Sequence, residues 1–403
     1  MVTSFYPPYN FGGDGIFTQR LARILVREGH EVHVVHDTDA YAFCTQDVAQ
    51  TDAPEQETDG VKIHSIGTGD GTNLDLILRH QLGRPVSKRQ QLKTLLNDKF
   101  DVIHFHNVSL MGGPDILKYG TGVKLCTLHD HWFVCAMHVL WKYDREACTA
   151  RSCLSCTIAG KRPPQIWRYT GAVERAAKHV GAFIAPSEFA RLSHINNGFP
   201  APIRVLPHFM PAEQIEVHTE IEDRPAYFLF VGRLEKLKGV QYLIEQFKTY
   251  KQAQLLIAGT GAYEAQLRAQ SANEPHIQFL GKVSNERLAA LYHGAIAVLV
   301  PSLCFETFGL VALEGFAQGT PALVNKLGAL PEIIQDGGGL AYAGDDEFRS
   351  ALEKLRTDID FRNKLGQEGL ANLRSNYTQQ RHLKEYYAMI ADLDYSRKRQ
   401  KTT

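Results

Sequence analysis

Short apolar runs alternate with amphipathic stretches along the first half of the chain. Residues 17–28 place Leu21, Ile24 and Leu25 at helical spacing, and Gly29 ends this predicted helix. Because helical stretches also separate the apolar runs, the pattern predicts βαβ units and a parallel sheet. The predicted strands are residues 31–35, 61–66, 101–105, 124–128 and 182–185.

The same alternation restarts at residue 227, after a stretch (196–224) rich in Asn, Pro, His and acidic residues. Ser187 is expected to cap a helix over residues 188–195. The pattern predicts two doubly wound α/β domains joined by a linker. We assign 1–210 to the first, with a Cys-rich insertion at about 131–165, and 211–378 to the second. A final helix within 379–403 is expected to pack across the domain junction, with a disordered basic tail at 397–401.

Composition and charge exclude some classes of protein but do not identify the function. The chain has 403 residues, and Lys+Arg and Asp+Glu both count 44, so no net charge draws it to nucleic acid. An anionic ligand must therefore meet a local cluster of cations. No apolar run approaches the roughly 18 residues that span a bilayer. Seven cysteines, an odd number, argue against a disulfide scaffold and favour the cytoplasm.

The strongest motif of the second half is Val-Gly-Arg-Leu-Glu-Lys-Leu-Lys-Gly at 231–239. An apolar strand ends at Gly232, and Arg233 and Lys238 follow in one loop. Ligands of doubly wound sheets bind beyond the carboxyl ends of strands. Arg233 would offer phosphate oxygens a planar fork of donors, and Lys238 a compact charge. A solvated charged turn is the alternative that this motif alone leaves open.

A second motif, residues 301–310, runs from a buried strand into a predicted helix that contains Glu314. Thr307 is expected to cap this helix, which leaves backbone N–H groups at a positive helix terminus suited to phosphate. These N–H groups belong to Phe308, Gly309 and Leu310. Glu306 in the loop and Glu314 in the helix could accept hydrogen bonds from sugar hydroxyls. An ordinary surface carboxylate is the alternative for Glu314.

Together these motifs resemble glycosyltransferase family 4, in order, from about residue 4 to 390. Each motif is weak alone, but the combination is highly specific. The resemblance implies the GT-B fold, two Rossmann-like domains facing across a cleft, and a UDP- or GDP-sugar donor with no cofactor required for catalysis. Four shorter pieces complete it: Phe5-Tyr6-Pro7-Pro8, Gly12-Gly13, Gly259-Thr260-Gly261 and Gly328-Ala329-Leu330-Pro331-Glu332.

The resemblance also implies roles at the donor site. Gly13 would give the donor phosphates close access to the first loop, where a side chain would clash. Arg233 and Lys238 would neutralise the diphosphate as it leaves. Glu306 would face the donor sugar, and Glu314 would bind the ribose.

His129, in Thr-Leu-His-Asp at 127–130, matches the family's histidine near the reacting sugar. A hydrogen-bonded structural histidine at a strand end is the alternative. His104 and His106 are expected to be structural or to support the site from behind. The family retains the anomeric configuration, and no carboxylate of this chain is assigned as a covalent nucleophile.

The insertion carries four cysteines, Cys135, Cys148, Cys153 and Cys156, the last two spaced C-x-x-C. Four thiolates can enclose a structural zinc ion, and reduced cysteines packed in a loop are the alternative. Because the insertion follows His129 directly, it is expected to shape the acceptor side.

A basic stretch near residues 79–93 suggests contact with an anionic membrane, with a solvated basic helix as the alternative. Its cations and histidine are Arg79, His80, Arg84, Lys88, Arg89 and Lys93. This would place a cytoplasmic protein peripherally at the inner face of the membrane.

The predicted function is transfer of a hexose-type sugar from a nucleotide donor to a glycan or lipid-linked acceptor, in cell-envelope polysaccharide or glycoconjugate assembly. The alternatives are a nucleotide-sugar epimerase of the same fold and a non-catalytic sugar-nucleotide-binding protein. The base, the sugar, the acceptor, the linkage and the oligomeric state are not encoded in motifs of this kind.

Overall fold

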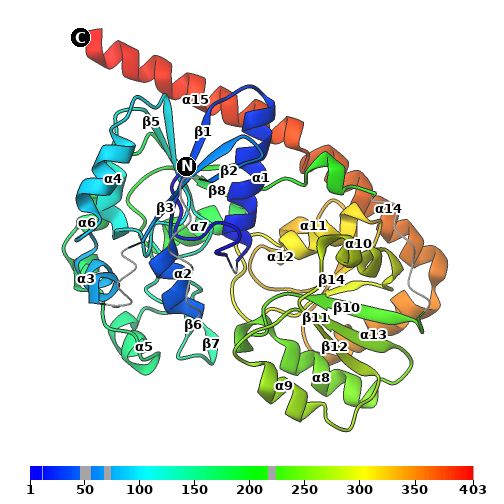
Figure 1. The fold of residues 1–403 in the computed structure, drawn as a ribbon. Helices are drawn as coiled ribbons and strands as arrows, with labels where there is room; N and C mark the ends of the chain where they lie inside the picture. The colour runs from blue at the N-terminus through cyan, green and yellow to red at the C-terminus, as the bar shows by residue number, and fades with distance from the viewer. Residues whose placement is uncertain (11, 46–55, 68–73, 217–223, 403) are drawn as a thin grey trace. The chain divides into compact units, whose positions relative to one another are not determined.

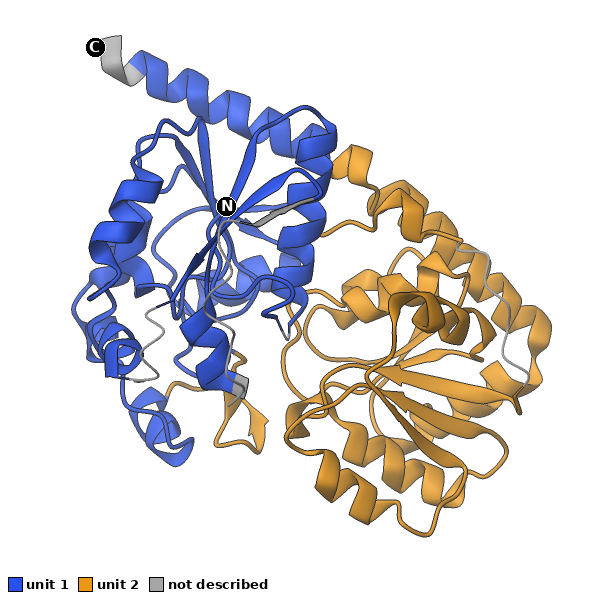
Figure 2. Cartoon of the chain, in the orientation of Figure 1, with its two compact units in different colours: residues 1–138, 152–206, 383–403 blue, residues 139–151, 207–382 orange. Residues whose placement is uncertain are grey.

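The computed structural model describes residues 1–10, 12–45, 56–67, 74–216 and 224–402 (Figure 1). The chain divides into two compact units (Figure 2). Unit 1 comprises residues 1–138, 152–206 and 383–403, and unit 2 comprises residues 139–151 and 207–382. Each unit is built around parallel strands, as the alternating sequence pattern predicts.

Unit 1 contains a sheet of order β1-β3-β2 and a sheet of order β4-β5-β8-β9. Val2 pairs in parallel with both Val35 and Phe105, so the first residues link the two sheets. All named strand pairs of unit 1 are parallel except β2–β3. The strands are β1 (Val32–Asp37), β2 (Gln56–Thr58), β3 (Val61–Ile66), β4 (Val102–Phe105), β5 (Val123–Thr127), β8 (Ala182–Ala185) and β9 (Ile203–Val205).

Helices fill the connections between these strands. The first begins at Gly13, four residues before the predicted start, because the Asn10 amide donates to the Gly12 carbonyl at 2.8 Å and holds Gly12 as an extended N-cap. The predicted cap of α7 is confirmed, since the Ala190 N–H donates to Ser187 Oγ at 3.0 Å. The helices are α1 (Gly13–Arg27), α2 (Thr38–Thr45), α3 (Leu74–Leu82), α4 (Arg89–Leu96), η1 (Gly113–Lys118), α5 (Cys153–Ala159), η2 (Ile166–Tyr169), α6 (Ala172–Ala177) and α7 (Glu188–Asn196).

Unit 2 contains a six-stranded parallel sheet of order β12-β11-β10-β13-β14-β15. Successive residues of β10 face two separate cores: Phe228 and Phe230 pack with α8 and α13, and Leu229 packs with α10, α11 and α14. The sheet is therefore buried on both faces, which explains its continuous apolar runs. The strands are β10 (Tyr227–Val231), β11 (Gln254–Ala258), β12 (Ile277–Gly281), β13 (Val298–Val300), β14 (Ala322–Asn325) and β15 (Gly339–Tyr342). Residues 139–151 add a hairpin of β6 (Trp141–Lys142) and β7 (Glu146–Ala147).

The helices of unit 2 lie on both faces of its sheet (Figure 1). They are η3 (Ala212–Gln214), η4 (Lys236–Lys238), α8 (Val240–Thr249), α9 (Glu264–Gln270), α10 (Asn285–Gly294), α11 (Leu310–Ala317), α12 (Leu330–Ile333), α13 (Asp345–Thr357) and α14 (Ile359–Asn376).

The last helix, α15 (Gln379–Thr402), begins in unit 2 and continues into unit 1 after His382. In unit 1, Tyr386 reaches His104, and Asp392 pairs with Arg204 at 3.2 Å. The basic tail at 397–401 was predicted to be disordered, and this prediction is wrong because the helix continues through it. In the part of the chain that is described, no helix has the length and apolar character required to cross a membrane.

Candidate donor and acceptor sites

The loop after β10 is shaped by close backbone packing. Gly232 has φ 154°, and a Cβ on Gly259 would overlap the Gly232 carbonyl oxygen. The Leu234 N–H donates to the Thr260 carbonyl at 2.9 Å. The glycines of Gly259-Thr260-Gly261 therefore serve to seat the neighbouring loop against β11, a role that requires them to lack side chains.

An ion pair lies at the carboxyl end of this sheet. Lys238 Nζ donates to Glu306 Oε1 at 2.6 Å, and Ser302 Oγ donates to the same oxygen at 2.6 Å. The Lys238 and Glu306 side chains are 23% and 21% exposed, so the pair is reachable from solvent. The structure thus joins two residues that the sequence assigned to separate motifs.

The pair holds both groups in their charged forms. Burial alone would raise the pKa of Glu306, but Lys238, Ser302 and Arg233 together lower it below its ordinary value. Burial and Arg233 oppose the charge on Lys238, yet Glu306 and Cys304 raise the pKa of Lys238 overall. Arg233 lies close enough to influence both groups. Its Nη1 donates to Glu235 Oε1 at 2.6 Å, and its side chain is 40% exposed.

The loop that carries Glu306 is braced by the Gly-Ala-Leu-Pro-Glu motif. Gly328 has φ 66°, and a Cβ there would lie 2.8 Å from the Glu306 backbone nitrogen. The Ala329 N–H donates to the Glu306 carbonyl at 3.0 Å. This motif therefore fixes the backbone position of Glu306.

Helix α11 begins at Leu310, with Gly309 as its N-cap at φ 136° and no side-chain cap. The prediction that Thr307 caps this helix is wrong, because the left-handed Gly309 turns the chain two residues later. The Phe308 side chain is buried against His208 and Tyr377, with ring centroids 5.0 and 5.8 Å apart. Glu314 lies inside the helix, where Tyr292 Oη donates to its Oε2 at 2.8 Å.

In unit 1, His129 follows β5 and is partly exposed. Its Nε2 lies 3.0 Å from His106 Nδ1, and its ring packs on Phe17 at 5.5 Å. Burial lowers the pKa of His129, although Asp14 and Asp130 act in the opposite direction. A neutral imidazole is thus favoured at this strand end.

Gly13 is the first residue of α1 in the same unit. The next residue, Asp14, was missed by sequence reasoning: its Oδ2 accepts from Asn107 Nδ2 at 2.9 Å. No motif indicated this pair, because Asp14 and Asn107 are far apart in the sequence. The His-x-His spacing at the end of β4 is the sequence feature that points to His106.

The structure does not show the predicted zinc site. All four cysteines are described, and among the described residues no group of three or more His, Cys, Asp or Glu side chains is placed to hold a metal ion. Cys153 and Cys156 share one turn of α5, where Cys156 is buried, and Cys148 Sγ contacts the Ala150 carbonyl at 3.5 Å. Zinc binding by these four cysteines is therefore not shown.

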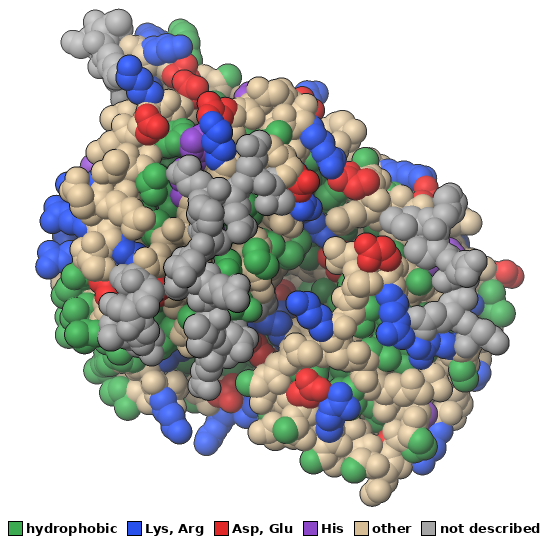
Figure 3. Space-filling view, in the orientation of Figure 1, with side chains coloured by type: hydrophobic (Ala, Val, Ile, Leu, Met, Phe, Trp, Pro, Cys, Tyr) green, Lys and Arg blue, Asp and Glu red, His purple; other side chains and the backbone are tan. Residues whose placement is uncertain are grey.

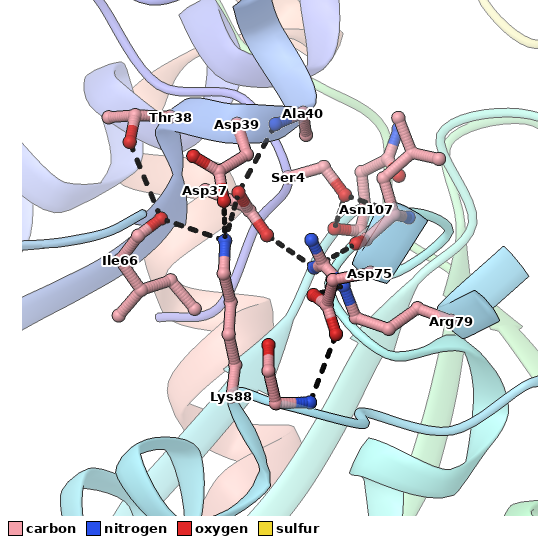
Figure 4. Close-up of polar contacts among 12 residues, drawn as sticks. Ser4, Asp37, Thr38, Asp39, Ala40, Ile66, Asp75, Arg79, Lys88 and Asn107 are labelled. Atoms are coloured by element: carbon pink, nitrogen blue, oxygen red, sulfur yellow. Dashed lines mark hydrogen bonds and ion pairs between the residues drawn. The ribbon is translucent and has the colours of Figure 1, made fainter. Parts of the chain in front are cut away.

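The basic stretch at 79–93 also differs from its prediction, because Arg79 and Lys88 are buried. Both cations contact carboxylates (Figure 4). Arg79 Nη1 donates to Asp37 Oδ2 at 2.5 Å, and Lys88 Nζ donates to Asp37 Oδ1 at 2.8 Å. Lys88 also pairs with Asp39 at 2.7 Å, and Arg79 with Asp75 at 2.7 Å. We call these five side chains the Asp37 cluster. Its cations hold protein carboxylates and cannot serve a membrane surface.

Comparisons with known proteins test the family assignment. The family model described as Glycosyltransferase Family 4 matches residues 11–214, just over half of the chain. The chain belongs to glycosyltransferase family 4. The model described as Glycosyl transferases group 1 matches residues 212–371 of this family 4 glycosyltransferase. The predicted transferase activity is thereby confirmed at the level of the enzyme class.

Individual relatives agree with this assignment. An uncharacterized glycosyltransferase of Methanocaldococcus jannaschii is 29% identical over 387 residues, covering 90% of each chain. Sucrose-phosphate synthase of Thermosynechococcus elongatus is similar in structure, with a TM-score of 0.76 and 18% identity over 98% of each chain. Anabaena HepE, solved in complex with UDP and glucose, gives a TM-score of 0.68 at 14% identity over 97% of this chain and 99% of its own. These structures confirm the predicted GT-B fold of the family 4 glycosyltransferase.

Proposed function

We propose that this enzyme is a retaining glycosyltransferase that moves a hexose-type sugar from a nucleoside-diphosphate donor to a glycan or lipid-linked acceptor. The observation that carries the proposal is the Lys238–Glu306 pair beside Arg233, at the carboxyl end of β10. Two cations and an uncapped helix N-terminus in one half-exposed region suit a diphosphate. The adjoining carboxylates suit sugar hydroxyls.

Donor binding would exchange the partners of this pair. A diphosphate brings more negative charge than Glu306, so Lys238 Nζ would move from the carboxylate to a phosphate oxygen. Glu306 would then be released to accept a hydrogen bond from a donor-sugar hydroxyl. The partial exposure of both side chains allows this exchange without opening the core.

Arg233 and Lys238 would stabilise the charge that develops on the leaving diphosphate. Donors aimed at developing charge are worth about 3 kcal/mol each in comparable sites. Glu314 would bind the ribose, Gly13 would allow close approach of the phosphates, and His129 would act near the reacting sugar. The acceptor would attack on the face that the diphosphate leaves, so that configuration is retained.

The donor base is proposed from the relatives. HepE was solved with UDP and glucose, which makes a UDP-sugar the first donor to test and a GDP-sugar the second. The product would be a polysaccharide or glycoconjugate of the cell envelope.

Thermal unfolding with UDP, GDP, TDP or ADP, in EDTA, tests this donor site. A ligand that binds only the folded protein stabilises it by about 2.7 kcal/mol at a hundred times its Kd. We expect one base to raise the Tm of the wild type and to raise that of Arg233→Ala much less. Arg356→Ala is the matched control, since Arg356 also pairs with a glutamate but lies in the last turn of α13. No shift with any nucleotide at millimolar concentration would contradict the proposal.

We also propose that unit 1 contacts a membrane surface, through apolar side chains of α3 rather than through the buried cations. Leu74 is 64% exposed, Ile77 42% and Leu82 44%. Hydrophobic side chains gather over this part of unit 1 in Figure 3. The exposed Arg84 and Arg89 follow closely in the sequence and would meet anionic headgroups. The enzyme would then act in the cytoplasm, peripherally at the inner face of the membrane.

Cosedimentation with vesicles tests this contact. We expect binding to vesicles of mixed anionic and neutral lipid that weakens in Ile77→Ser and persists in Ile359→Ser, whose parent residue is 55% exposed on α14. Equal binding by both variants, or none by the wild type, would contradict this contact while leaving the donor site untouched.

A further inference from the structure

Two histidine contacts join the carboxyl ends of β4 and β5. In the first, His104 Nε2 lies 2.8 Å from Thr127 Oγ1, and its Nδ1 lies 3.2 Å from Tyr386 Oη. In the second, His106 Nδ1 lies 3.0 Å from His129 Nε2. His104 and His106 are both buried, 3% exposed, with ring centroids 4.0 Å apart. In the first contact, both ring nitrogens of His104 face hydroxyl groups. In the second contact, His106 reaches the partly exposed His129.

We propose that His106 is a positioning residue for His129, fixing both the orientation and the tautomer of its imidazole. This inference rests on the proposed role of His129 near the reacting sugar. Between two ring nitrogens, one must donate and the other accept. If His106 Nδ1 donates, the neutral His129 ring carries its proton on Nδ1; if His129 Nε2 donates, its Nδ1 is bare. In either case the contact with His106 occupies Nε2, so His106 determines whether the buried Nδ1 of His129 carries the proton.

The surroundings hold the two rings in this contact. Phe17 of α1 packs against both, at 6.3 Å from His106 and 5.5 Å from His129. The charged groups that face the pair are Asp14 from α1 and Asp130 from the loop after β5. Asp14 is bound by Asn107, and Asp130 by His138 at 2.8 Å. His104 lies behind His106 with its ring tilted by 34°, and Tyr386 of α15 contacts the His104 ring. His106 thus supplies the ring-to-ring hydrogen bond that selects the proton position on His129.

Nuclear magnetic resonance of the histidine side chains, in ¹⁵N-histidine-labelled full-length enzyme, tests this role without requiring activity. In the wild type we expect His129 to occupy one neutral tautomer near pH 7.5. In His106→Phe we expect a mixture of His129 tautomers. His104→Phe is the matched control, because it removes an equally buried histidine whose ring nitrogens contact Thr127 and Tyr386, and it should leave the tautomer of His129 unchanged.

Two outcomes would overturn the proposal: an unchanged His129 spectrum in folded His106→Phe, or a mixture of His129 tautomers in the wild type. The second measurement needs no variant, so the test survives a variant that fails to fold. With an active donor, His106→Phe should lower kcat on the order of tenfold and shift its pH profile, with an unchanged donor KM. If no donor supports transfer, the proposed function fails while the resonance experiment still decides the role of His106.

Discussion

The Asp37 cluster and the Lys238–Glu306 pair both join cationic side chains to carboxylates, but they differ in their exposure to solvent. In unit 1, the Asp37, Arg79 and Lys88 side chains are 0–2% exposed, and both oxygens of Asp37 accept from cations. In unit 2, Lys238 and Glu306 are more than a fifth exposed. The first arrangement has no access for a ligand, whereas the second can open toward one.

The difference teaches how to separate structural from functional ion pairs in this fold. A buried pair that loses one partner leaves a charge without solvation, so it resists change. A half-exposed pair can exchange a protein partner for a ligand at little cost, because water can solvate the released group. Both sites lie at the ends of parallel strands, so accessibility rather than location distinguishes them.

The largest expected effect comes from Asp37→Asn. It removes a carboxylate shared by two buried cations, so the free energy of unfolding should fall by about 3–5 kcal/mol. Urea unfolding would measure this loss, with Glu306→Gln as the comparison from unit 2. We expect Glu306→Gln to cost much less stability; equal losses would remove the distinction between the two sites.

Lys238→Ala should instead lower activity with little effect on stability. We expect kcat to fall by about 100-fold, which corresponds to about 3 kcal/mol of transition-state stabilisation, while the urea midpoint changes little. Lys236→Ala is the control, since Lys236 is 44% exposed and binds the Asp144 carbonyl at 2.9 Å. Its kcat should remain near that of the wild type. Full activity in Lys238→Ala would mean that the Lys238–Glu306 pair has a structural role and no role in catalysis.

Acidification should affect the surroundings of the Asp37 cluster first. Burial lowers the pKa of the adjacent His36 from 6.5 to about 4, although Asp37 acts against this. The unfolded chain therefore binds a proton on His36 below about pH 6.5, while the folded chain does not until about pH 4. Lowering the pH from 7 to 5 should thus reduce stability by about 2 kcal/mol from this residue.

Urea midpoints at pH 7, 6 and 5 would measure this loss, and the decline should be shallower in His36→Gln. The pKa of Glu306 is instead lowered, so its contribution is present above the unfolded value of about 4.5 and is lost only as the pH falls below it. An equal decline in wild type and His36→Gln would exclude His36 as the source.

The smallest effect is expected at Glu314. Glu314→Gln keeps the shape of the side chain but removes the charge that accepts from Tyr292 Oη. We expect the Kd for the nucleoside diphosphate to rise about five- to tenfold, equivalent to about 1 kcal/mol, with little change in stability. Isothermal titration calorimetry would measure it, and Tyr292→Phe should have a smaller effect. Unchanged affinity in Glu314→Gln would contradict the ribose-binding role.

Local signals in the sequence predicted the strands well. The strand at 182–185 matches β8, a continuous apolar run that is buried on both faces. The strand at 61–66 matches β3, where apolar residues are interspersed with polar ones. Helix starts were predicted less well where a neighbouring side chain or a left-handed glycine sets them. The start of α1 depends on Asn10, and that of α11 on Gly309.

Charge partners could not be predicted in the same way. The Arg79–Asp37 contact spans 42 residues and the Lys238–Glu306 contact 68. The sequence shows that a cationic residue is present, but it does not show whether that residue is paired with a carboxylate in the folded protein. This is why the basic stretch at 79–93 suggested a surface, while the structure buries two of its members.

The division of α15 between the units has a consequence for recombination within the family. Unit 2 is interrupted in sequence, and residues 383–403 are grouped with the N-terminal unit, where Tyr386 meets His104 and Asp392 meets Arg204. A hybrid enzyme that simply joins one homologue's first half to another's second half would import a foreign C-terminal helix into unit 1. Exchange of residues 207–382 alone would keep those native contacts. The proposed donor site would therefore move as one internal segment, while both ends of the chain would keep their native sequence.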